Sequence, residues 1–273
     1  MIGTKTGAER ITAAFAKGKQ AFIPFITAGY PTPELTMDIA LALQEEGATV
    51  IELGVPYSDP LADGPTIQHA SAQALSYGIT IGRTVELAAE MRRAGLTVPL
   101  VLFTYINPVL QYGPERLFKD MEAFGIDGIL IPDLPVEEAG DIEALAQTYV
   151  RPLIQLVAPT SEQRVEMIAS RARGFLYCVS SLGVTGARAT LDEGVTRFLE
   201  QVRAFSSVPI AVGFGISSAE QAQMVAPYSD GFIVGSALLE KIREAEPLLT
   251  HEETKEEGFR IVKRFVQQLQ SRV

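Results

Sequence analysis

The chain has 273 residues, of which 47% are hydrophobic and 21% are charged, and its formal net charge is −10. This composition suits a globular protein with a sizeable core, and it excludes a general nucleic-acid or anionic-membrane surface, because both require a basic field. Residues 1–10 lack the apolar run of a secretory signal, and no stretch is long enough to cross a bilayer, so we expect a cytoplasmic protein.

Eight short apolar runs recur along the whole chain and are predicted to be β-strands. Each run is nearly continuously apolar rather than alternating, which is typical of parallel strands covered on both faces. Antiparallel hairpins are therefore disfavoured. The runs span residues 21–27, 49–55, 98–104, 128–132, 152–158, 175–179, 208–214 and 231–235.

Between these runs, apolar residues recur at helical spacing, so strand and helix are expected to alternate. The helical sets include Leu35/Ile39/Leu43, Leu117/Met121/Phe124, Val165/Ile168 and Val195/Phe198/Val202/Phe205. Pro33 and Pro114 stand where a first helical turn is expected, and Ser218 with Gln221 has the spacing of a capping box. Glycines at positions 47, 95 and 125 should end helices.

Eight strand–helix units of about thirty residues predict a closed (β/α)8 barrel, the TIM-barrel fold, as a single domain over residues 1–273. An open doubly wound sheet usually has fewer strands and a dinucleotide loop, but the first loop here, TAGYPTPE, is not GxGxxG. An extra amphipathic segment from Glu9 to Lys17 should close the bottom of the barrel. The last helix should complete the outer ring with Phe259, Val262, Val266 and Leu269 on one face.

Glu52 lies inside the second apolar run, within the sequence IELGVPYSDPLADGPTIQ. Its side chain points into the barrel if Ile51 and Leu53 face the helices. A carboxylate in that position is costly unless it is paired or used in chemistry. The alternative is a structural glutamate that is solvated or hydrogen-bonded.

Asp59 and Asp63 follow in a loop crowded with proline and glycine, which predicts a shaped lid rather than a plain connection. Catalytic groups of such barrels lie at the C-terminal ends of strands and in the loops beyond them. Together with Glu52 these carboxylates could divide acid/base and substrate-orienting work. Alternatively, either aspartate could form a turn or cap a helix beginning near Thr66.

Three glycine-containing loops in the last third, SSLGVTGAR, GFGISS and GSALLE, predict a phosphate site. The seventh and eighth loops of these barrels present glycine N–H groups and a helix N-terminus to a phosphate dianion. No lysine or arginine occurs from Ser206 to Glu240, so the charge would be met by Gly215, Gly235 and Ser236, with Arg188 the nearby cation. The alternative is that these glycines only permit tight turns.

Several residue types are missing where other barrel chemistries need them. The seven lysines, at positions 5, 17, 19, 119, 241, 255 and 263, lie neither in nor directly after a predicted strand, which disfavours a Schiff-base aldolase. His69, His251 and the single Cys178 are too few and too scattered for a metal site, so we expect no metal. Cys178 lies in the apolar run FLYCV and is interpreted as a core residue.

Seven ordered motifs over nearly the whole chain resemble those of tryptophan synthase α subunits. They are IELGVPYSDPLADGPTIQ, FTYINPVLQYG, GILIPDLPVEE, LVAPTS, YCVSSLGVTGAR, GFGISS and IVGSALL. The resemblance implies a lyase of tryptophan biosynthesis that splits indole-3-glycerol phosphate into indole and glyceraldehyde 3-phosphate. It also implies that this chain needs no cofactor of its own.

The resemblance further implies that Glu52 is the general acid/base and that Asp63 holds the indole N–H. In a retro-aldol cleavage, the substituted indole carbon gains a proton while the adjacent glycerol hydroxyl loses one. A carboxyl group that first donates a proton and then accepts one is suited to both steps. A fixed carboxylate near the ring nitrogen stabilises the developing positive charge. By the same resemblance, Phe25 and Tyr177 line the indole end, and Thr185 belongs to a sixth loop that closes over the substrate. The phosphate would be held by Gly186, Gly215, Gly235 and Ser236.

The family works with a pyridoxal-phosphate β subunit that receives indole through a tunnel, so the resemblance implies an α2β2 heterotetramer. Asp59 and Asn107 resemble the family's contact surface for that partner.

Two alternatives remain open. One is another phosphosugar barrel enzyme, such as an isomerase or a relative of indole-glycerol-phosphate synthase, although the strand lysine of the latter is absent. The other is a regulatory partner subunit with little catalysis, against which the presence of Glu52 and Asp63 speaks.

Overall fold

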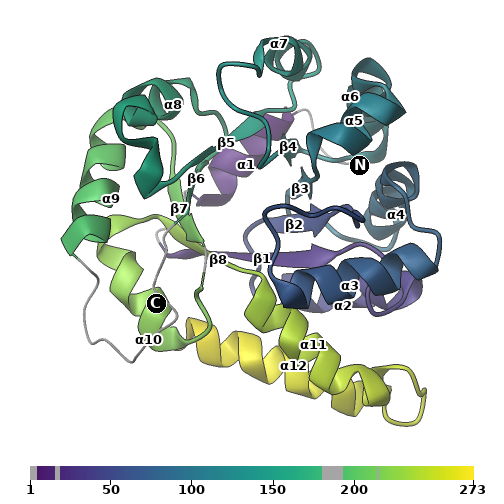
Figure 1. Cartoon of the computed structure of the whole chain (residues 1–273). Helices are drawn as coiled ribbons and strands as arrows, with labels where there is room; N and C mark the ends of the chain where they lie inside the picture. Colours follow the sequence, from purple (N-terminus) through teal and green to yellow (C-terminus); the bar gives the residue numbers. More distant parts are fainter. Residues whose placement is uncertain (1–4, 16–18, 180–192, 214) are drawn as a thin grey trace.

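The computed structural model describes residues 5–15, 19–179, 193–213 and 215–273. Within them, eight parallel strands close into a barrel in which each strand pairs with the next and β1 pairs with β8 (Figure 1). This confirms the predicted (β/α)8 barrel. The strands are β1 (Ala21–Thr27), β2 (Ile51–Gly54), β3 (Leu100–Phe103), β4 (Gly128–Leu130), β5 (Leu153–Val157), β6 (Leu176–Val179), β7 (Ile210–Gly213) and β8 (Gly231–Val234).

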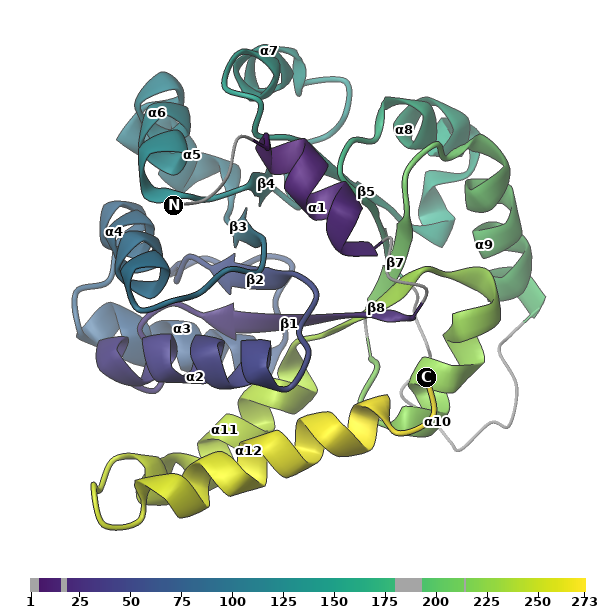
Figure 2. The same ribbon diagram turned by 180° about the vertical axis from the view of Figure 1, so that it is seen from behind.

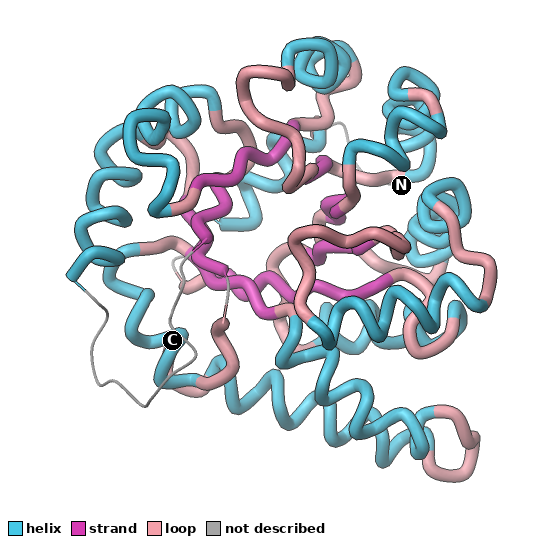
Figure 3. Tube along the Cα trace, viewed as in Figure 1, coloured by secondary structure: helices cyan, strands magenta, loops and turns pink. Residues whose placement is uncertain are grey.

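Helices surround this ring of strands (Figure 3). They are α1 (Gly7–Phe15), α2 (Pro33–Glu45), α3 (Pro65–Ser76), α4 (Ile81–Arg93), α5 (Ile106–Tyr112), α6 (Pro114–Phe124), α7 (Gly140–Thr148), α8 (Val165–Arg171), α9 (Glu193–Phe205), α10 (Ala219–Val225), α11 (Ser236–Leu249) and α12 (Lys255–Gln270), with short 3-10 helices η1 (Pro159–Arg164) and η2 (Ala226–Tyr228). No helix among the described residues is long and apolar enough to cross a membrane.

Local sequence signals place the helix ends as predicted. Pro33 and Pro114 stand in the first turns of α2 and α6, and Gly125 ends α6 in the left-handed conformation. The Ser218 hydroxyl caps α10 by accepting the N–H of Gln221. These caps satisfy backbone groups that a helix end otherwise leaves without partners.

Among the described residues, three strand–helix units carry a second α-helix, because α11 and α12 both follow β8, and the second helices after β2 and β3 are ones that the simple alternating pattern does not predict. After β2 the chain forms α3 and then α4, and after β3 it forms α5 and then α6. A glycine with positive φ separates the helices of each pair, Gly78 at 75° and Gly113 at 93°. Because such angles are costly for residues with a side chain, the glycines end one helix and let the next begin in a new direction. The extra helices α3 and α5 bring additional chain to the mouth of the barrel.

Alternate residues of each strand face opposite sides of the barrel wall. Ile51 and Leu53 belong to the large core between strands and helices. The residues that fill the barrel interior form a separate buried cluster, which includes Ile23, Val101, Leu130, Ile154, Phe175, Tyr177, Ala211 and Ile233. Since both neighbours of Glu52 face the helices, Glu52 faces the interior, as predicted.

The N-terminal helix α1 closes one end of the barrel and crosses in front of the strands when the molecule is seen from behind (Figure 2). Its Ile11 and Phe15 are buried in the interior cluster, and the Phe15 ring lies 5.6 Å from that of Phe175. A Cβ at Gly7 would collide with the carbonyl oxygen of Asp127, so the helix can approach the barrel this closely only with glycine there. The predicted closure of the barrel bottom is confirmed.

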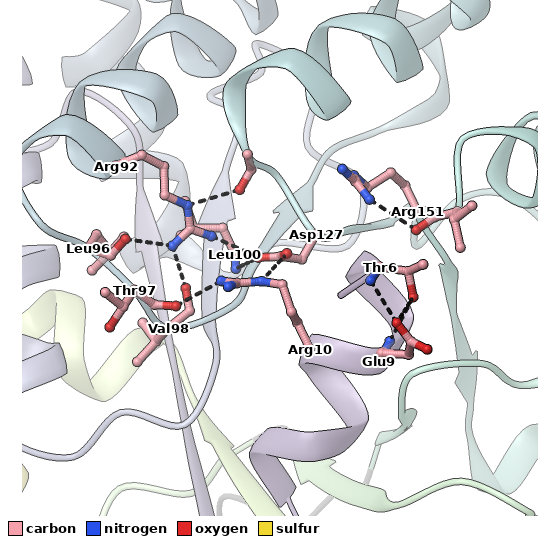
Figure 4. A network of polar contacts seen from close by, with 12 residues as sticks. Thr6, Glu9, Arg10, Arg92, Leu96, Thr97, Val98, Leu100, Asp127 and Arg151 are labelled. Carbon is pink, nitrogen blue, oxygen red and sulfur yellow. Dashed lines mark hydrogen bonds and ion pairs between the residues drawn. The ribbon is translucent and has the colours of Figure 1, made fainter. Parts of the chain in front are cut away.

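Asp127 anchors this end through a buried polar network (Figure 4). Its carboxylate accepts from Arg10 Nε and Arg92 Nη2, both at 2.7 Å, and from the Leu100 N–H at 2.9 Å. One carboxylate therefore links α1, α4 and the start of β3. Charge-assisted bonds of this kind are strong when they are shielded from water.

At the other end of the chain, α12 lies along α11 (Figures 1 and 2). Val262, Val266 and Leu269 are buried on one face of α12, and Phe259 packs partly buried against the same core. The prediction that this helix completes the outer ring is confirmed. Its packing also fixes α11, whose first residues lie directly after β8.

Candidate functional site

The carboxyl group of Glu52 is held inside the barrel with almost no access to water. The residue is 1% exposed, and its Oε1 atom is buried without a hydrogen-bond partner among the described residues. Burial raises the pKa of Glu52 from 4.5 to about 8, because an apolar site disfavours the charged form. A glutamate in this state carries a proton near neutral pH. The alternative of a solvated structural glutamate does not fit these surroundings.

Aromatic side chains surround this carboxyl group. Phe25 is the cross-strand partner of Glu52, and its ring meets Phe103 of β3 edge-to-face with 5.3 Å between the ring centres. Tyr177 on β6 is buried, and burial together with the charges of Glu52 and Asp63 raises its pKa. Tyr177 therefore lies close enough to Glu52 and Asp63 for their negative charges to disfavour its ionisation. The structure thus brings four predicted site residues, Phe25, Glu52, Asp63 and Tyr177, to one region.

Two glycines make room for these rings, and sequence reasoning missed their role. A Cβ at Gly54 would stand 2.5 Å from Cζ of Phe25, and one at Gly213 would stand 2.6 Å from Cζ of Tyr177. Side chains at positions 54 and 213 would push the aromatic walls away from Glu52. The signal was present in the sequence, since a glycine at the end of a predicted strand often marks a close approach.

Asp63 lies in the second loop (residues 55–64), between β2 and α3, and is half-buried. Burial raises the pKa of its carboxyl group, and hydrogen bonding with the Tyr105 hydroxyl opposes that rise. The backbone around Asp63 is also fixed, because Ala62 N–H donates to the Tyr105 hydroxyl at 3.0 Å and Gln68 Nε2 donates to the Asp63 carbonyl at 2.8 Å. The N-cap of α3 is Gly64, which has no side-chain cap, so neither aspartate of this loop caps the helix.

Tyr105 is a third residue whose role sequence reasoning missed. It lies inside the motif FTYINPVLQYG, but its relation to Asp63 depends on the packing of the second loop against the start of α5. Such a contact between residues 42 positions apart leaves no periodic signal in the sequence. Only the resemblance of the motif could have drawn attention to it.

The predicted phosphate residues lie at the ends of two neighbouring strands. Gly215 follows β7 with a φ of 87°, and Gly235 is the N-cap residue of α11, directly after β8, with no side-chain cap. Ser236 is the exposed first residue of α11. An uncapped N-terminus of a 14-residue helix offers N–H groups and a positive dipole end to an anion. Thr185, Gly186 and Arg188 lie outside the described residues.

Asp59 and Asn107 are both exposed, on the second loop and on α5. Asn107 Nδ2 donates to the Tyr57 hydroxyl at 3.2 Å, so the loop and the helix form one surface. Two apolar side chains stand out from it, Leu61 with 90% exposure and Leu110 with 58%. Exposed leucines of this size beside polar residues are typical of a surface that a partner covers.

Cys178 is fully buried, and burial raises the pKa of its thiol, as suits the core residue predicted from the sequence. Within the part of the chain that the structure describes, no three histidine, cysteine, aspartate or glutamate residues come together as a metal site. The described site residues offer the carboxyl groups of Glu52 and Asp63, the hydroxyl groups of Tyr105, Tyr177 and Ser236, and backbone amides.

Taken together, the closed barrel, the buried Glu52 carboxyl group with its raised pKa and the uncapped start of α11 are features of a (β/α)8-barrel enzyme. The sequence model of the family described as "Tryptophan synthase alpha chain" matches residues 11–272. The chain belongs to the tryptophan synthase alpha chain family.

Individual relatives agree with this membership over nearly full length. The tryptophan synthase alpha chain of Geobacillus kaustophilus is 58% identical to this chain, and the match covers 84% of this chain and 85% of that relative. The tryptophan synthase alpha chain of Halalkalibacterium halodurans is 51% identical, and the match covers 95% of this chain and 98% of that relative. Among solved structures, tryptophan synthase subunit alpha from Legionella pneumophila has a TM-score of 0.85 at 34% identity, covering 96% of this chain and 97% of its own. A chain of M. tuberculosis tryptophan synthase, in an open form with BRD0059 bound, has a TM-score of 0.83 at 32% identity over 99% of both chains.

Proposed function

We propose that this chain is a carbon–carbon lyase that splits indole-3-glycerol phosphate into indole and glyceraldehyde 3-phosphate in tryptophan biosynthesis, with Glu52 and Asp63 as its catalytic residues. The observation that carries the residue assignment is the buried Glu52 carboxyl group, whose Oε1 atom has no partner in the described structure and whose pKa rises to about 8. Family membership supplies the substrate. The site supplies a group able to transfer the required protons.

Glu52 gives its proton to the indole carbon that carries the glycerol side chain. This protonation makes the ring nitrogen electron-poor, and the carbon–carbon bond can then break as the neighbouring hydroxyl loses its proton. The carboxylate left on Glu52 is suited to take that proton, which restores the starting state. A carboxyl group with a pKa of about 8 can act in both directions near neutral pH, because its two protonation states are close in free energy there.

Asp63 holds the indole N–H and stabilises the positive charge that develops on the ring during protonation. Its backbone is fixed on both sides by hydrogen bonds to Tyr105 and Gln68, so the carboxylate is positioned before the substrate arrives. Phe25 and Tyr177 form apolar walls for the indole ring. These walls also exclude water, which strengthens every electrostatic contact inside the site.

The phosphate is held by Gly186, Gly215, Gly235 and Ser236, and Thr185 belongs to the sixth loop, which contacts the substrate. The uncapped start of α11 supports this assignment, because its first N–H groups lie at the end of the strand next to the one that carries Gly215. Binding through backbone amides is consistent with the lack of a basic side chain from residue 206 to 240.

The partner is a tryptophan synthase β subunit, and we propose that Asp59 and Asn107 contact it in an α2β2 assembly. Their exposed surface, with Leu61 and Leu110, supports the assignment. Indole passes to the β subunit, which holds the pyridoxal phosphate, and this chain uses no cofactor or metal. We further propose that residues 1–273 act as one domain and that the protein works in the cytoplasm.

The test is to incubate the purified chain with indole-3-glycerol phosphate, with and without a β subunit, and to follow indole. Indole release is expected, and its absence under both conditions would overturn the lyase assignment. A Glu52→Gln variant should lose indole release and still activate the β subunit. Unchanged indole release in that variant would instead remove Glu52 from the mechanism. Glu122→Gln, on the exposed face of α6, is the matched control.

A further inference from the structure

The Tyr105 hydroxyl occupies a central position between the third and second loops of the barrel. Tyr105 follows β3 as the N-cap residue of α5 and is 2% exposed. Its hydroxyl oxygen accepts the N–H of Ala62 at 3.0 Å, so its own proton stays free for donation. Asp63 is the next residue along the chain, and hydrogen bonding with Tyr105 lowers the pKa of its carboxyl group against the effect of burial.

The Tyr105 ring cannot easily swing away from this position. Directly after it, the Ile106 N–H donates to Asp133 Oδ1 at 2.9 Å, which fixes the first turn of α5. On its other side, the ring packs against Tyr57 of the second loop, with 5.3 Å between ring centres and 34° between ring planes. Tyr57 in turn accepts from Asn107 Nδ2 at 3.2 Å. The second loop is therefore bound to α5 at two points, one on each tyrosine.

We propose that Tyr105 is a positioning residue for Asp63: its hydroxyl holds the backbone at Ala62 and the adjacent carboxylate over the mouth of the barrel, while Tyr57 braces its ring. The proposal rests on the proposed role of Asp63 and deepens it. An aspartate on an exposed loop would otherwise sample many orientations, and catalysis needs it near one. Misplacing such a group by about 1 Å can cost on the order of a hundredfold in rate.

The deciding variant is Tyr105→Phe, which keeps the ring and its packing against Tyr57 and removes only the hydroxyl. We expect kcat for indole release to fall by about tenfold or more, with KM changed by less than about threefold, because the substrate's phosphate contacts are untouched. The acid limb of the pH profile of kcat should move to higher pH. The sign follows because the lost hydrogen bond favoured the ionised form of Asp63.

A matched control is Tyr112→Phe, also on α5, whose hydroxyl donates to Asp120 at 2.7 Å. It should leave both kcat and the acid limb unchanged. If Tyr105→Phe does not fold, 3-fluorotyrosine at position 105 keeps the shape with a more acidic phenol, and the acid limb should then move to lower pH. Wild-type kcat and pH profile in Tyr105→Phe, or no shift with 3-fluorotyrosine, overturns the proposal.

Failure of this proposal can be told apart from failure of the proposed function. Indole release by the wild type that is lost in Asp63→Asn but kept in Tyr105→Phe removes only the positioning role of Tyr105. Full activity in Asp63→Asn removes the role of Asp63 itself, and the positioning proposal falls with it. Loss of activity in both variants, with the pH shift only in Tyr105→Phe, supports both.

Discussion

Glu52 on β2 stands directly across the parallel strand pair from Phe25 on β1, so the buried carboxyl group faces a phenyl ring rather than a charge partner. In that position the protonated form is favoured, and ionisation has a free-energy cost. This relationship links the chemistry of the site to the stability of the whole barrel.

The first prediction is that Glu52→Gln stabilises the protein at neutral pH. The pKa of Glu52 is about 8 in the fold and near 4.5 when the chain is unfolded. Between these values the unfolded chain gives up a proton that the folded chain keeps, so the free energy of unfolding falls as pH rises. Between pH 4.5 and 7 the wild type should lose roughly 3 kcal/mol of unfolding free energy, at about 1.4 kcal/mol per pH unit. Glu52→Gln should avoid this loss, because glutamine cannot ionise.

Urea unfolding of both proteins from pH 4.5 to 9 measures this effect. The difference in unfolding free energy should grow up to about pH 8, where the pKa of folded Glu52 lies, and then level off. The unfolding free energy of Glu122→Gln should differ from that of the wild type by the same amount at every pH, because the Glu122 side chain is exposed. A constant difference between Glu52→Gln and the wild type would mean that Glu52 is ionised inside the barrel.

The orientation of Glu52 could be predicted from the sequence, because both neighbours are apolar and a strand alternates its faces. The phosphate loops and the closing helix α1 were likewise marked by glycines and by amphipathic spacing. Gly54 and Gly213 carried only a general signal, a glycine at the end of a strand, and Tyr105 carried none. Their roles depend on which side chain from another strand or loop comes near them, and that proximity exists only in the closed barrel.

The second prediction concerns the glycine that makes room for Tyr177. Gly213→Ala should place a methyl group against the Tyr177 ring, shift the wall of the indole pocket and reduce kcat/KM for indole release by at least tenfold. Overpacking should also destabilise the barrel by about 1–3 kcal/mol. Steady-state kinetics and urea unfolding measure the two effects. Gly140→Ala is the control, since a Cβ there meets nothing within 4 Å, and it should leave kcat/KM unchanged.

The third prediction separates stability from activity. Asp127→Ala leaves the buried Arg92 guanidinium and the Leu100 N–H without their partner and should cost about 3–5 kcal/mol in unfolding free energy. The folded fraction should keep its activity at low temperature, because Asp127 lies at the α1 end and Glu52 and Asp63 do not contact its network.

Asp230 offers a matched comparison, because it also binds an arginine and a strand N–H. It accepts from Arg203 at 2.6 Å and from the Ile210 N–H at 2.7 Å, but its side chain is 36% exposed. Water can replace the lost partner there, so Asp230→Ala should cost only about 1 kcal/mol. Equal costs for the two variants would show that burial of the Asp127 network contributes nothing.

The fourth prediction tests the partner surface. Leu61, the most exposed large apolar side chain among the described residues, lies between Asp59 and Asp63 on the second loop. If the β subunit covers this loop, Leu61→Asp should weaken its binding by at least about tenfold, because a charge would be buried against an apolar contact. The unfolding free energy should stay within about 0.5 kcal/mol of the wild type, since the side chain packs on nothing in the free chain.

Titration calorimetry with the β subunit measures the affinity. Val150→Asp, directly after the C-cap residue of α7, is the control and should bind like the wild type. Unchanged binding of Leu61→Asp would place the interface elsewhere.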